Sequence, residues 1–263
     1  MGKKRRIAQI TAFAASNLGI SGVLQMLKTG FVCPFLYCHG CPFAAFGCPI
    51  GILQNSRDFV TFNQFGVILF TLGSLGIYGV IFGRAFCGWG CPFGTLHDLL
   101  SPLNRGHKDR TTDYQYLKYA VLLLALTAAW LASDTVFCKF CPSGSLFAAL
   151  PFRILNSGFS GVGLYFYIHM ATLALTVVLA IIVSRFWCRY ICPLGAIAGI
   201  FNKVGMLRIH LDDSRCKQCN ECLEGCVMGI SEKEEIGYST DCILCGRCVE
   251  RCGEEALSFR WGR

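Results

Sequence analysis

The sequence predicts a helical membrane protein, with four transmembrane helices in two parallel repeats, followed by a small α+β domain. Three observations predict this fold class. The 263 residues are 54% hydrophobic and only 15% charged, whereas soluble domains carry about 25% charged residues. Cysteine motifs recur at a spacing of about one hundred residues, and residues 212–263 carry a second, denser cysteine pattern.

Four stretches are apolar and long enough to cross a hydrocarbon core of roughly 30 Å, which takes about 20 helical residues. They cover Ile7–Leu27, Phe65–Gly83, Tyr114–Ser133 and Val162–Ser184. The first stretch also follows a basic segment, as in a signal peptide. It is longer than the apolar region of such peptides, however, and no small-residue cleavage site follows it. We therefore expect a multi-pass protein of the cell membrane.

The charges predict the orientation and the domain boundary. An even number of crossings places both termini on one side, and that side carries 13 of the 17 lysines and arginines of residues 1–211. Basic loops mark the cytoplasmic side, so the N- and C-termini are expected in the cytoplasm. Residues 1–211 have a net charge of +12 and residues 212–263 a net charge of −4. This shift predicts a transmembrane domain over 1–211 and a separate domain over 212–263.

The transmembrane domain contains an internal repeat, over about residues 1–105 and 106–211. Each repeat consists of a helix, outer cysteines, a second helix and an inner CxxxCP motif. Two crossings per repeat give both the same orientation, so equivalent motifs are expected at the same depth. Four Cys-Pro-x-Gly segments continue in apolar runs too short to span, and we predict re-entrant loops or interfacial turns beside bound cofactors. They begin at Cys48, Cys91, Cys141 and Cys192.

The C-terminal domain carries the most specific pattern, because C-x2-C-x2-C-x3-C occurs in it twice. Bacterial ferredoxins with two [4Fe-4S] clusters have this spacing, and the fourth cysteine of each run binds the other cluster. Zinc sites and disulfide modules have other spacings. We therefore predict a dicluster ferredoxin-like fold. One cluster is expected on Cys216, Cys219, Cys222 and Cys252, and the second on Cys242, Cys245, Cys248 and Cys226.

The inner cysteines of the two repeats predict a further cluster. Clustered thiolates at membrane depth are costly as free charges, so a metal that they ligate explains them better. The repeats bring two CxxxCP motifs to one face, where they offer four thiolates. We assign an inner [4Fe-4S] cluster to Cys87, Cys91, Cys188 and Cys192.

The outer face offers six cysteines to a cluster that needs four. We favour Cys41, Cys48, Cys138 and Cys141, with Cys38 or Cys33 as substitutes. A leftover pair could form a disulfide on the oxidising side of the membrane. Two or three structural disulfides in place of an outer cluster are the alternative interpretation.

The segments FCGWGCPFGTLHD and WCRYICPLGAIAG, together with the C-terminal pattern, resemble the NapH and NosR type of membrane-bound polyferredoxin. The resemblance covers most of the chain. It implies electron transfer between a quinol or cytoplasmic donor and an extracytoplasmic acceptor, within a larger complex. The expected partners are membrane lipid and redox proteins, with quinone as an open alternative, and no nucleic acid is expected.

The sequence offers no evident catalytic base, nucleophile or substrate pocket, so we expect an electron-transfer subunit rather than an enzyme by itself. It would relay electrons between a cytoplasmic donor and a membrane or extracytoplasmic acceptor through about four [4Fe-4S] clusters. One alternative is a quinone-linked oxidoreductase subunit with His97 and Asp98 as a proton relay. Another is a redox-sensing or metal-centre maturation protein. His169, inside the fourth helix, is interpreted as a packed, hydrogen-bonded core residue rather than a haem ligand.

Overall fold

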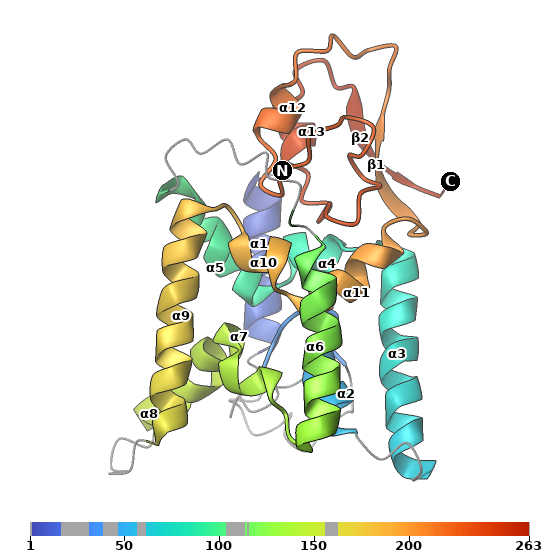
Figure 1. The fold of residues 1–263 in the computed structure, drawn as a ribbon. Coiled ribbons are helices and arrows are strands. Elements are labelled where there is room, and N and C mark those ends of the chain that lie inside the picture. Colours follow the sequence, from blue (N-terminus) through green and yellow to red (C-terminus); the bar gives the residue numbers. More distant parts are fainter. Residues whose placement is uncertain are drawn as a thin grey trace.

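The computed structural model describes residues 2–16, 32–38, 47–56, 62–103, 114, 116–155 and 163–262. Long helices run side by side, and a small module with two strands lies at one end of them (Figure 1). Helix α1 (Gly2–Ser16) begins at this end, and strand β2 (Leu257–Trp261) also lies there. The short helices that carry the cysteines fill the space between the long ones.

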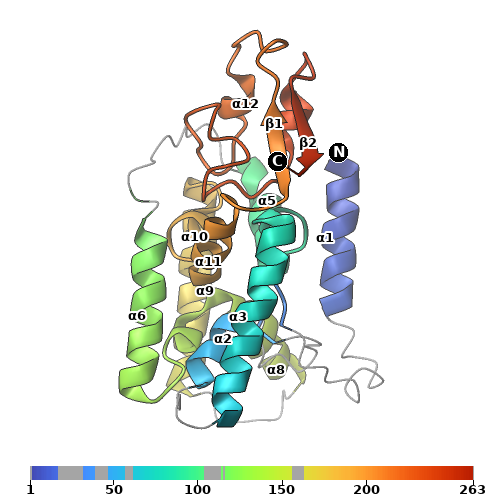
Figure 2. The same cartoon turned by 90° about the vertical axis from the view of Figure 1, so that its right-hand side faces the viewer.

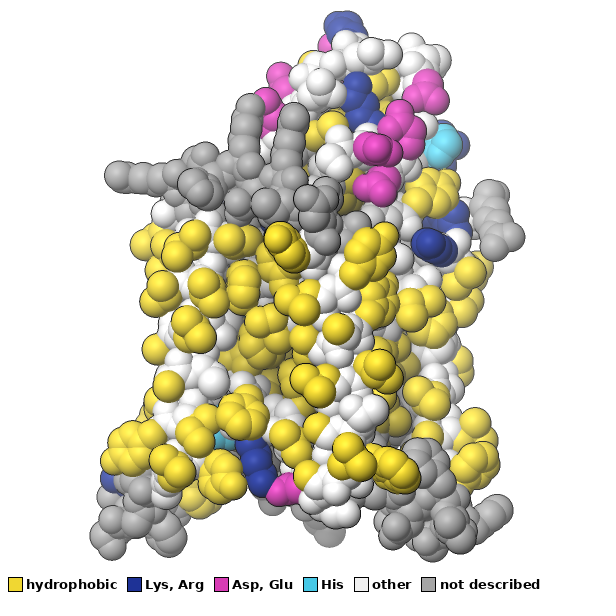
Figure 3. Space-filling model, in the orientation of Figure 1, with side chains coloured by type: hydrophobic (Ala, Val, Ile, Leu, Met, Phe, Trp, Pro, Cys, Tyr) yellow, Lys and Arg dark blue, Asp and Glu magenta, His cyan; other side chains and the backbone are white. Residues whose placement is uncertain are grey.

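Three of the predicted apolar stretches are helical: α3 (Phe62–Phe82), α6 (Leu117–Ala132) and α9 (Leu164–Ile182). Within the described residues, two helices are long and apolar enough to cross a membrane, over Phe65–Phe82 and Leu164–Ile182, and α6 is shorter. Their outer faces are open, with Leu131 77% and Leu164 72% exposed. Hydrophobic side chains cover this part of the surface, whereas acidic side chains gather on the end module (Figure 3). An apolar surface of this kind fits a lipid environment.

Hydroxyl side chains inside these apolar helices bond to their own backbone. Thr71 donates to the carbonyl of Val67 at 2.7 Å, and Thr176 donates to that of Thr172 at 2.8 Å. A carbonyl four residues earlier can accept such a bond without breaking the helix. These residues therefore leave no unpaired hydroxyl in an apolar setting.

Helix α1 differs from the prediction, which started the first helix at Ile7. The helix begins at Gly2, so it includes the basic run before the apolar stretch. Arg5 and Gln9 both donate to the carboxylate of Asp98, at 3.2 and 3.0 Å. This distant partner explains why the basic residues are ordered in the helix. The rest of the predicted stretch, residues 17–27, lies outside the described residues.

The Cys-Pro segments begin helices, where turns were predicted. They open α2 (Pro49–Asn55), α5 (Pro92–Leu100), α7 (Pro142–Gly144) and α11 (Pro193–Phe201). In each, the cysteine is the N-cap residue with extended backbone, and the proline occupies the first turn. Proline lacks an N–H and has a helix-compatible φ, so it favours a helix start at this position.

The remaining short helices join these segments. Two five-residue helices, α4 (Ala85–Trp89) and α10 (Phe186–Tyr190), precede the nine-residue helices α5 and α11 in the same way. The others are η2 (Ser101–Leu103), η3 (Phe137–Phe140), the π-helical turn η4 (Ser145–Ala149) and α8 (Leu150–Leu155).

The end module consists of a two-stranded antiparallel sheet and two short helices, α12 (Glu221–Glu224) and α13 (Arg247–Arg251). Strand β1 (Leu207–Leu211) pairs with β2, with Leu207 opposite Trp261. The buried core of the module includes Ile209, and Ala85 of α4 belongs to the same core. Figure 2 shows the sheet above α3, with α1 and α6 on opposite sides of the bundle. The module is thus packed against the helices that carry the inner cysteines.

Candidate functional site

The four inner cysteines predicted from the repeat lie together. Cys87 and Cys188 belong to α4 and α10, and Cys91 and Cys192 cap α5 and α11. Cys91 interacts electrostatically with Cys87 and Cys188, and Cys192 interacts with the same two residues. All but Cys87 are buried. Equivalent helices therefore direct four thiols to one point.

Backbone amides support the two capping thiols. The N–H of Gly94 donates to the sulfur of Cys91 at 3.3 Å, and the N–H of Gly195 donates to the sulfur of Cys192 at 3.3 Å. The first amides of a helix lack partners within the helix and favour negative charge. Both caps are therefore suited to hold a thiolate, and such bonds orient and tune a metal ligand.

One arginine in each repeat contacts the other repeat. Arg84 donates through Nη2 to the carbonyl of Cys188 at 2.7 Å, and Arg185 donates through Nη1 to the carbonyl of Cys87 at 2.8 Å. Both side chains are about 1% exposed. From the sequence alone, both are only basic residues of the expected cytoplasmic side. They precede Cys87 and Cys188 by the same three residues, and this shared spacing is the signal that could have found them.

Asp98 is the counter-ion of Arg185. Its carboxylate accepts hydrogen bonds from Nε of Arg185 at 3.1 Å and from Nη2 at 2.6 Å. It also forms ion pairs with Arg5 and Arg247. Burial raises the pKa of Asp98, but the arginines, Arg185 foremost, outweigh this effect and lower it to about 2. Asp98 therefore stays ionised.

Within the described residues, no hydrogen bond links His97 to Asp98, the pair that was offered as an alternative proton relay. The side chain of His97 is buried, and neither ring nitrogen has a hydrogen-bond partner among the described residues. The ring packs edge-on against Phe93, with centroids 5.1 Å apart. Burial, together with the charge of Arg185, lowers the pKa of His97 to about 4. In this arrangement the imidazole is neutral and serves as packing.

Asp241 is the counter-ion of Arg84, and it comes from the end module. Its carboxylate lies 3.6 Å from Nη1 of Arg84 and forms an ion pair with Lys118 of α6. Arg84 also donates to the carbonyl of Thr240 at 2.9 Å. A buried charge requires a partner, so this carboxylate fixes the module onto the inner site.

Seven cysteines of the end module fall into two groups. Cys248 interacts electrostatically with Cys242, Cys245 and Cys226, so the fourth cysteine of the first run joins the second run. Cys222 interacts with Cys219 and Cys216. Cys252, the remaining residue of the predicted first set, packs against a hydrophobic core that Cys222 shares with Cys226, Cys242 and Cys248, so its place in the first set stays a prediction.

The second group of the module touches the inner site. Gly88 follows Cys87, and a side-chain carbon on it would lie 2.5 Å from the carbonyl of Ile243 and 3.2 Å from Cα of Cys245. Cys87, Cys226 and Cys245 pack against one small cluster formed by Val227, Met228 and Ile243. Glycine at position 88 therefore permits direct contact between the two cysteine-bearing loops.

The outer cysteines also gather in one place. Cys38, Cys48, Cys138 and Cys141 line a single pocket, together with Tyr37, Phe137 and Gly144. Of the favoured outer set, Cys41 lies outside the described residues. All described cysteines are free thiols, so Cys33 and Cys38 do not form the disulfide that was considered.

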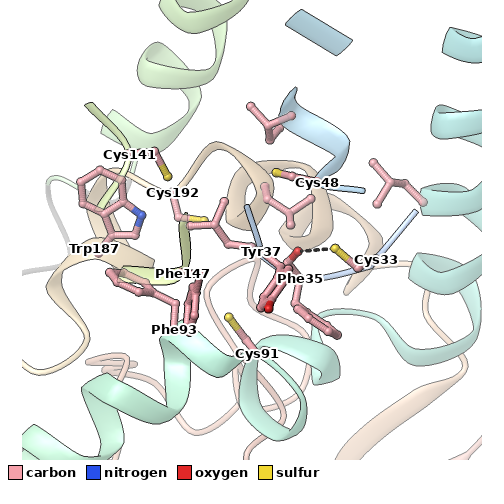
Figure 4. Close-up of a cluster of buried hydrophobic side chains, with 14 residues drawn as sticks. Cys33, Phe35, Tyr37, Cys48, Cys91, Phe93, Cys141, Phe147, Trp187 and Cys192 are labelled. Carbon is pink, nitrogen blue, oxygen red and sulfur yellow. Dashed lines mark hydrogen bonds between the residues drawn. The ribbon is translucent and has the colours of Figure 1, made fainter. Parts of the chain in front are cut away.

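Cys33 lies apart from this pocket, between the inner and outer groups. It interacts electrostatically with Cys48 and Cys91, and its sulfur donates to the carbonyls of Phe35 and Gly47, both at 3.2 Å. One hydrophobic core contains Cys33 together with cysteines of both groups and several aromatic rings (Figure 4). The inner and outer groups are therefore joined by packed side chains.

His169 of α9 lies beside the outer pocket. Its Nδ1 is 3.0 Å from Oγ of Ser145, and its ring approaches the position of a side-chain carbon on Gly144 to 3.7 Å. This hydrogen bond agrees with the interpretation of His169 as a packed, bonded residue. The backbone of Cys141 is a further hydrogen-bond partner of this side chain.

The donor set fits iron–sulfur clusters. Every group consists of thiols, which are the ligands of [4Fe-4S] clusters. In the described part of the chain, no three His, Cys, Asp or Glu side chains converge closely enough to hold a single metal ion. The four thiolates of a [4Fe-4S] cluster bind four different iron atoms. They therefore stand farther apart than thiolates that bind one metal ion.

Comparison with known proteins identifies the family. A model described as a 4Fe-4S binding domain matches residues 62–110 and 166–211, which contain the two CxxxCP motifs. The protein MJ0749 of Methanocaldococcus jannaschii is 33% identical over 70% of this chain and 67% of its own length. The ferredoxin-type protein NapH of Escherichia coli is 27% identical over 74% of this chain and 68% of its own, and that of Haemophilus influenzae is 28% identical over 69% and 64%. The chain belongs to the NapH-type polyferredoxin family.

This NapH-type protein accordingly binds [4Fe-4S] clusters, and its general function is iron–sulfur electron transfer. The family model matches two segments of the membrane part rather than the C-terminal module, in agreement with the internal repeat of the cysteine motifs. No solved structure is significantly similar to this chain.

Proposed function

We propose that this protein is an electron conduit across the membrane, with four [4Fe-4S] clusters held by its four cysteine groups. The observation that carries the proposal is the continuity of these groups. The module contacts the inner site at Gly88, and one buried core connects the inner and outer thiols. When bound, the clusters supply one-electron redox centres.

The chain itself supplies position and a dry environment for each centre. The inner ligands would be Cys87, Cys91, Cys188 and Cys192, and the module ligands would be the two crossed sets of the ferredoxin pattern. For the outer site we propose the four cysteines that line the pocket, Cys38, Cys48, Cys138 and Cys141. Aromatic rings such as Phe93 and Trp187 exclude water between the inner and outer groups.

The proposed topology has four transmembrane helices with both ends in the cytoplasm. The distribution of basic residues supports it, as does the position of α1 and β2 at the same end of the bundle (Figure 1). Electrons would then pass between a cytoplasmic donor and an acceptor on the outer side or in the membrane. We propose that partner redox proteins supply both, within a larger complex.

A quinone-linked oxidoreductase subunit is the second candidate, and one cavity favours it. A cavity of about 460 Å³ is lined by Phe82, Ala85, Phe86, Trp89, Leu207 and Phe259. This volume is within the usual range for small ligands, and the lining is apolar, as an isoprenoid chain requires. The cavity borders α4, the helix of Cys87.

Two measurements test these functions. Anaerobically purified protein should contain about 16 iron atoms per chain, because each of four clusters has four. A content of about eight would restrict iron to the C-terminal module and contradict the conduit. In liposomes, the conduit predicts electron flow from an enclosed reductant to an external dye without quinone. Flow that requires quinone, and that Ala85→Phe abolishes by filling the cavity, would support the second candidate instead.

A further inference from the structure

Arg84 and Arg185 are more than a link between repeats. Arg84 interacts electrostatically with three inner cysteines, namely Cys87, Cys192 and Cys188. Arg185 interacts with Cys188, with Cys91 and with Cys245 of the module. Each guanidinium therefore lies within electrostatic range of the inner thiols and also donates to a backbone carbonyl.

The cations at this site outnumber the carboxylates. Asp241 is shared by Arg84 and Lys118, and Asp98 is shared by Arg185, Arg5 and Arg247. Among the described side chains in these two networks, five cations therefore face two carboxylates. Buried charge in excess is costly unless further negative charge compensates it. Thiolate ligands would provide that charge.

One hydrogen-bond donor of Arg84 has no acceptor among the described residues. Its Nε is buried, and no described residue accepts a hydrogen bond from it, although Nη1 and Nη2 are both satisfied by backbone carbonyls. A buried donor of this kind rarely remains unpaired. The electrostatic neighbours of this guanidinium offer two kinds of acceptor, namely the sulfurs of three inner cysteines and the carboxylate of Asp241.

Glycines in the backbone leave space for both arginine side chains. A side-chain carbon on Gly195 would lie 2.5 Å from Nη2 of Arg84, and one on Gly94 would lie 3.2 Å from Nη1 of Arg185. Arg185 itself has a φ of 52°, in the left-handed region that residues other than glycine seldom adopt. Such strain persists only where the surroundings impose it, and it concentrates at functional sites.

From these observations we infer that Arg84 and Arg185 set the reduction potential of the inner cluster by stabilising its reduced form. The inference rests on the proposed cluster at Cys87, Cys91, Cys188 and Cys192. A cluster gains one negative charge on reduction, and cluster potentials depend on net charge and on hydrogen bonds to sulfur. Two buried guanidiniums therefore raise the potential, which favours acceptance of an electron from the adjacent module.

The test is a redox titration of the reduced-cluster EPR signal in the full-length protein, with the signal that disappears in Cys91→Ala taken as that of the inner cluster. Arg84→Gln and Arg185→Gln should each disfavour reduction about tenfold, which lowers the midpoint by about 59 mV for a one-electron couple. Arg84→Lys keeps the charge but loses the Nε donor, so its shift should be smaller. Arg208→Gln is the matched control, because this buried arginine donates to the carbonyls of Gly205 and Lys203 and lies over the ring of Tyr238, away from the inner cysteines.

The outcomes separate the inference from the function on which it rests. Equal iron contents in the wild type and Cys91→Ala would mean that no inner cluster exists, and both would fail. A loaded inner cluster whose midpoint is unchanged in both glutamine variants would overturn the inference alone. Should the glutamine variants lose the cluster, Asp98→Asn decides, because it removes the carboxylate that neutralises Arg185: a raised midpoint supports the inference, and the wild-type midpoint contradicts it.

Discussion

Lys118 and Asp241 form an ion pair whose side chains are 0% and 5% exposed, and this pair joins α6 to the residue that precedes Cys242. Asp241→Asn would leave Lys118 and Arg84 as buried cations without a carboxylate. Breaking a buried pair in this way costs about 3–5 kcal/mol. We therefore expect the C-terminal module to detach at lower denaturant concentration, measured by limited proteolysis of the linker near Lys203.

Asp213→Asn is the control for this experiment, because Asp213 is an exposed acid of the same module. It should leave the proteolysis profile unchanged. Equal resistance of wild type and Asp241→Asn would show that the ion pair does not hold the module in place.

Gly88→Ala should weaken the contact between the inner site and the module. The new methyl group would lie 2.5 Å from the carbonyl of Ile243, and overpacking of this kind costs about 1–3 kcal/mol. The loop that carries Cys245 must move away, so electron transfer between the two sites should slow while the iron content stays constant. Rapid-freeze EPR after a reductant pulse measures this rate. Gly73→Ala, where a side-chain carbon meets nothing within 4 Å, should transfer electrons at the wild-type rate.

The outer pocket predicts a difference between two neighbouring cysteines. Cys38 lines the pocket with Cys48, Cys138 and Cys141, whereas the thiol of Cys33 bonds to backbone carbonyls. Cys38→Ala should therefore lose about four iron atoms per chain, one cluster's content, and Cys33→Ala should lose none. Iron and acid-labile sulfide analysis distinguishes the two variants. The opposite result would exchange the roles of Cys33 and Cys38.

His97 should make folding stability depend on pH in the acidic range. Its pKa is lowered to about 4 in the folded protein, against about 6.5 in an unfolded chain. The unfolded state therefore binds more protons than the folded state between these values. The contribution of His97 to the free energy of unfolding is complete above pH 6.5 and is lost as the pH falls through 4. The total loss is about 3 kcal/mol. His97→Phe should flatten the fall in melting temperature between pH 7 and pH 5, and an unaltered fall would refute the assignment.

The cysteine groups could be predicted because ligand chemistry fixes both residue type and spacing. The repeat of the CxxxCP motif in turn predicts that Cys87 and Cys91 lie with Cys188 and Cys192. Arg84 and Arg185 share the same repeat, but an arginine at the end of an apolar helix has an ordinary explanation in membrane topology. Their role depends on contacts across about one hundred residues, which spacing alone does not reveal.

The start of α1 and the helical nature of the Cys-Pro segments were missed for physical reasons too. Arg5 is ordered by Asp98, 93 residues away, and a window along the chain contains no information about such a partner. The segment at Cys91-Pro92 was predicted to be a re-entrant loop or an interfacial turn because its apolar run is too short to span a membrane. A short run can still be helical, because proline favours a helix start and the amide of Gly94 completes the cap on Cys91.

The position equivalent to Asp98 in the second repeat is Gly199, and the carbonyl of Thr240 would lie 2.3 Å from a side-chain carbon there. The carboxylate that this repeat lacks is supplied instead by Asp241, from a segment that is synthesised after both repeats. Charge neutralisation of the inner site therefore has to await the synthesis of this segment. Biogenesis of the protein should follow a fixed order, in which the helices of the two repeats form their final contacts only after the ferredoxin-like module folds onto them.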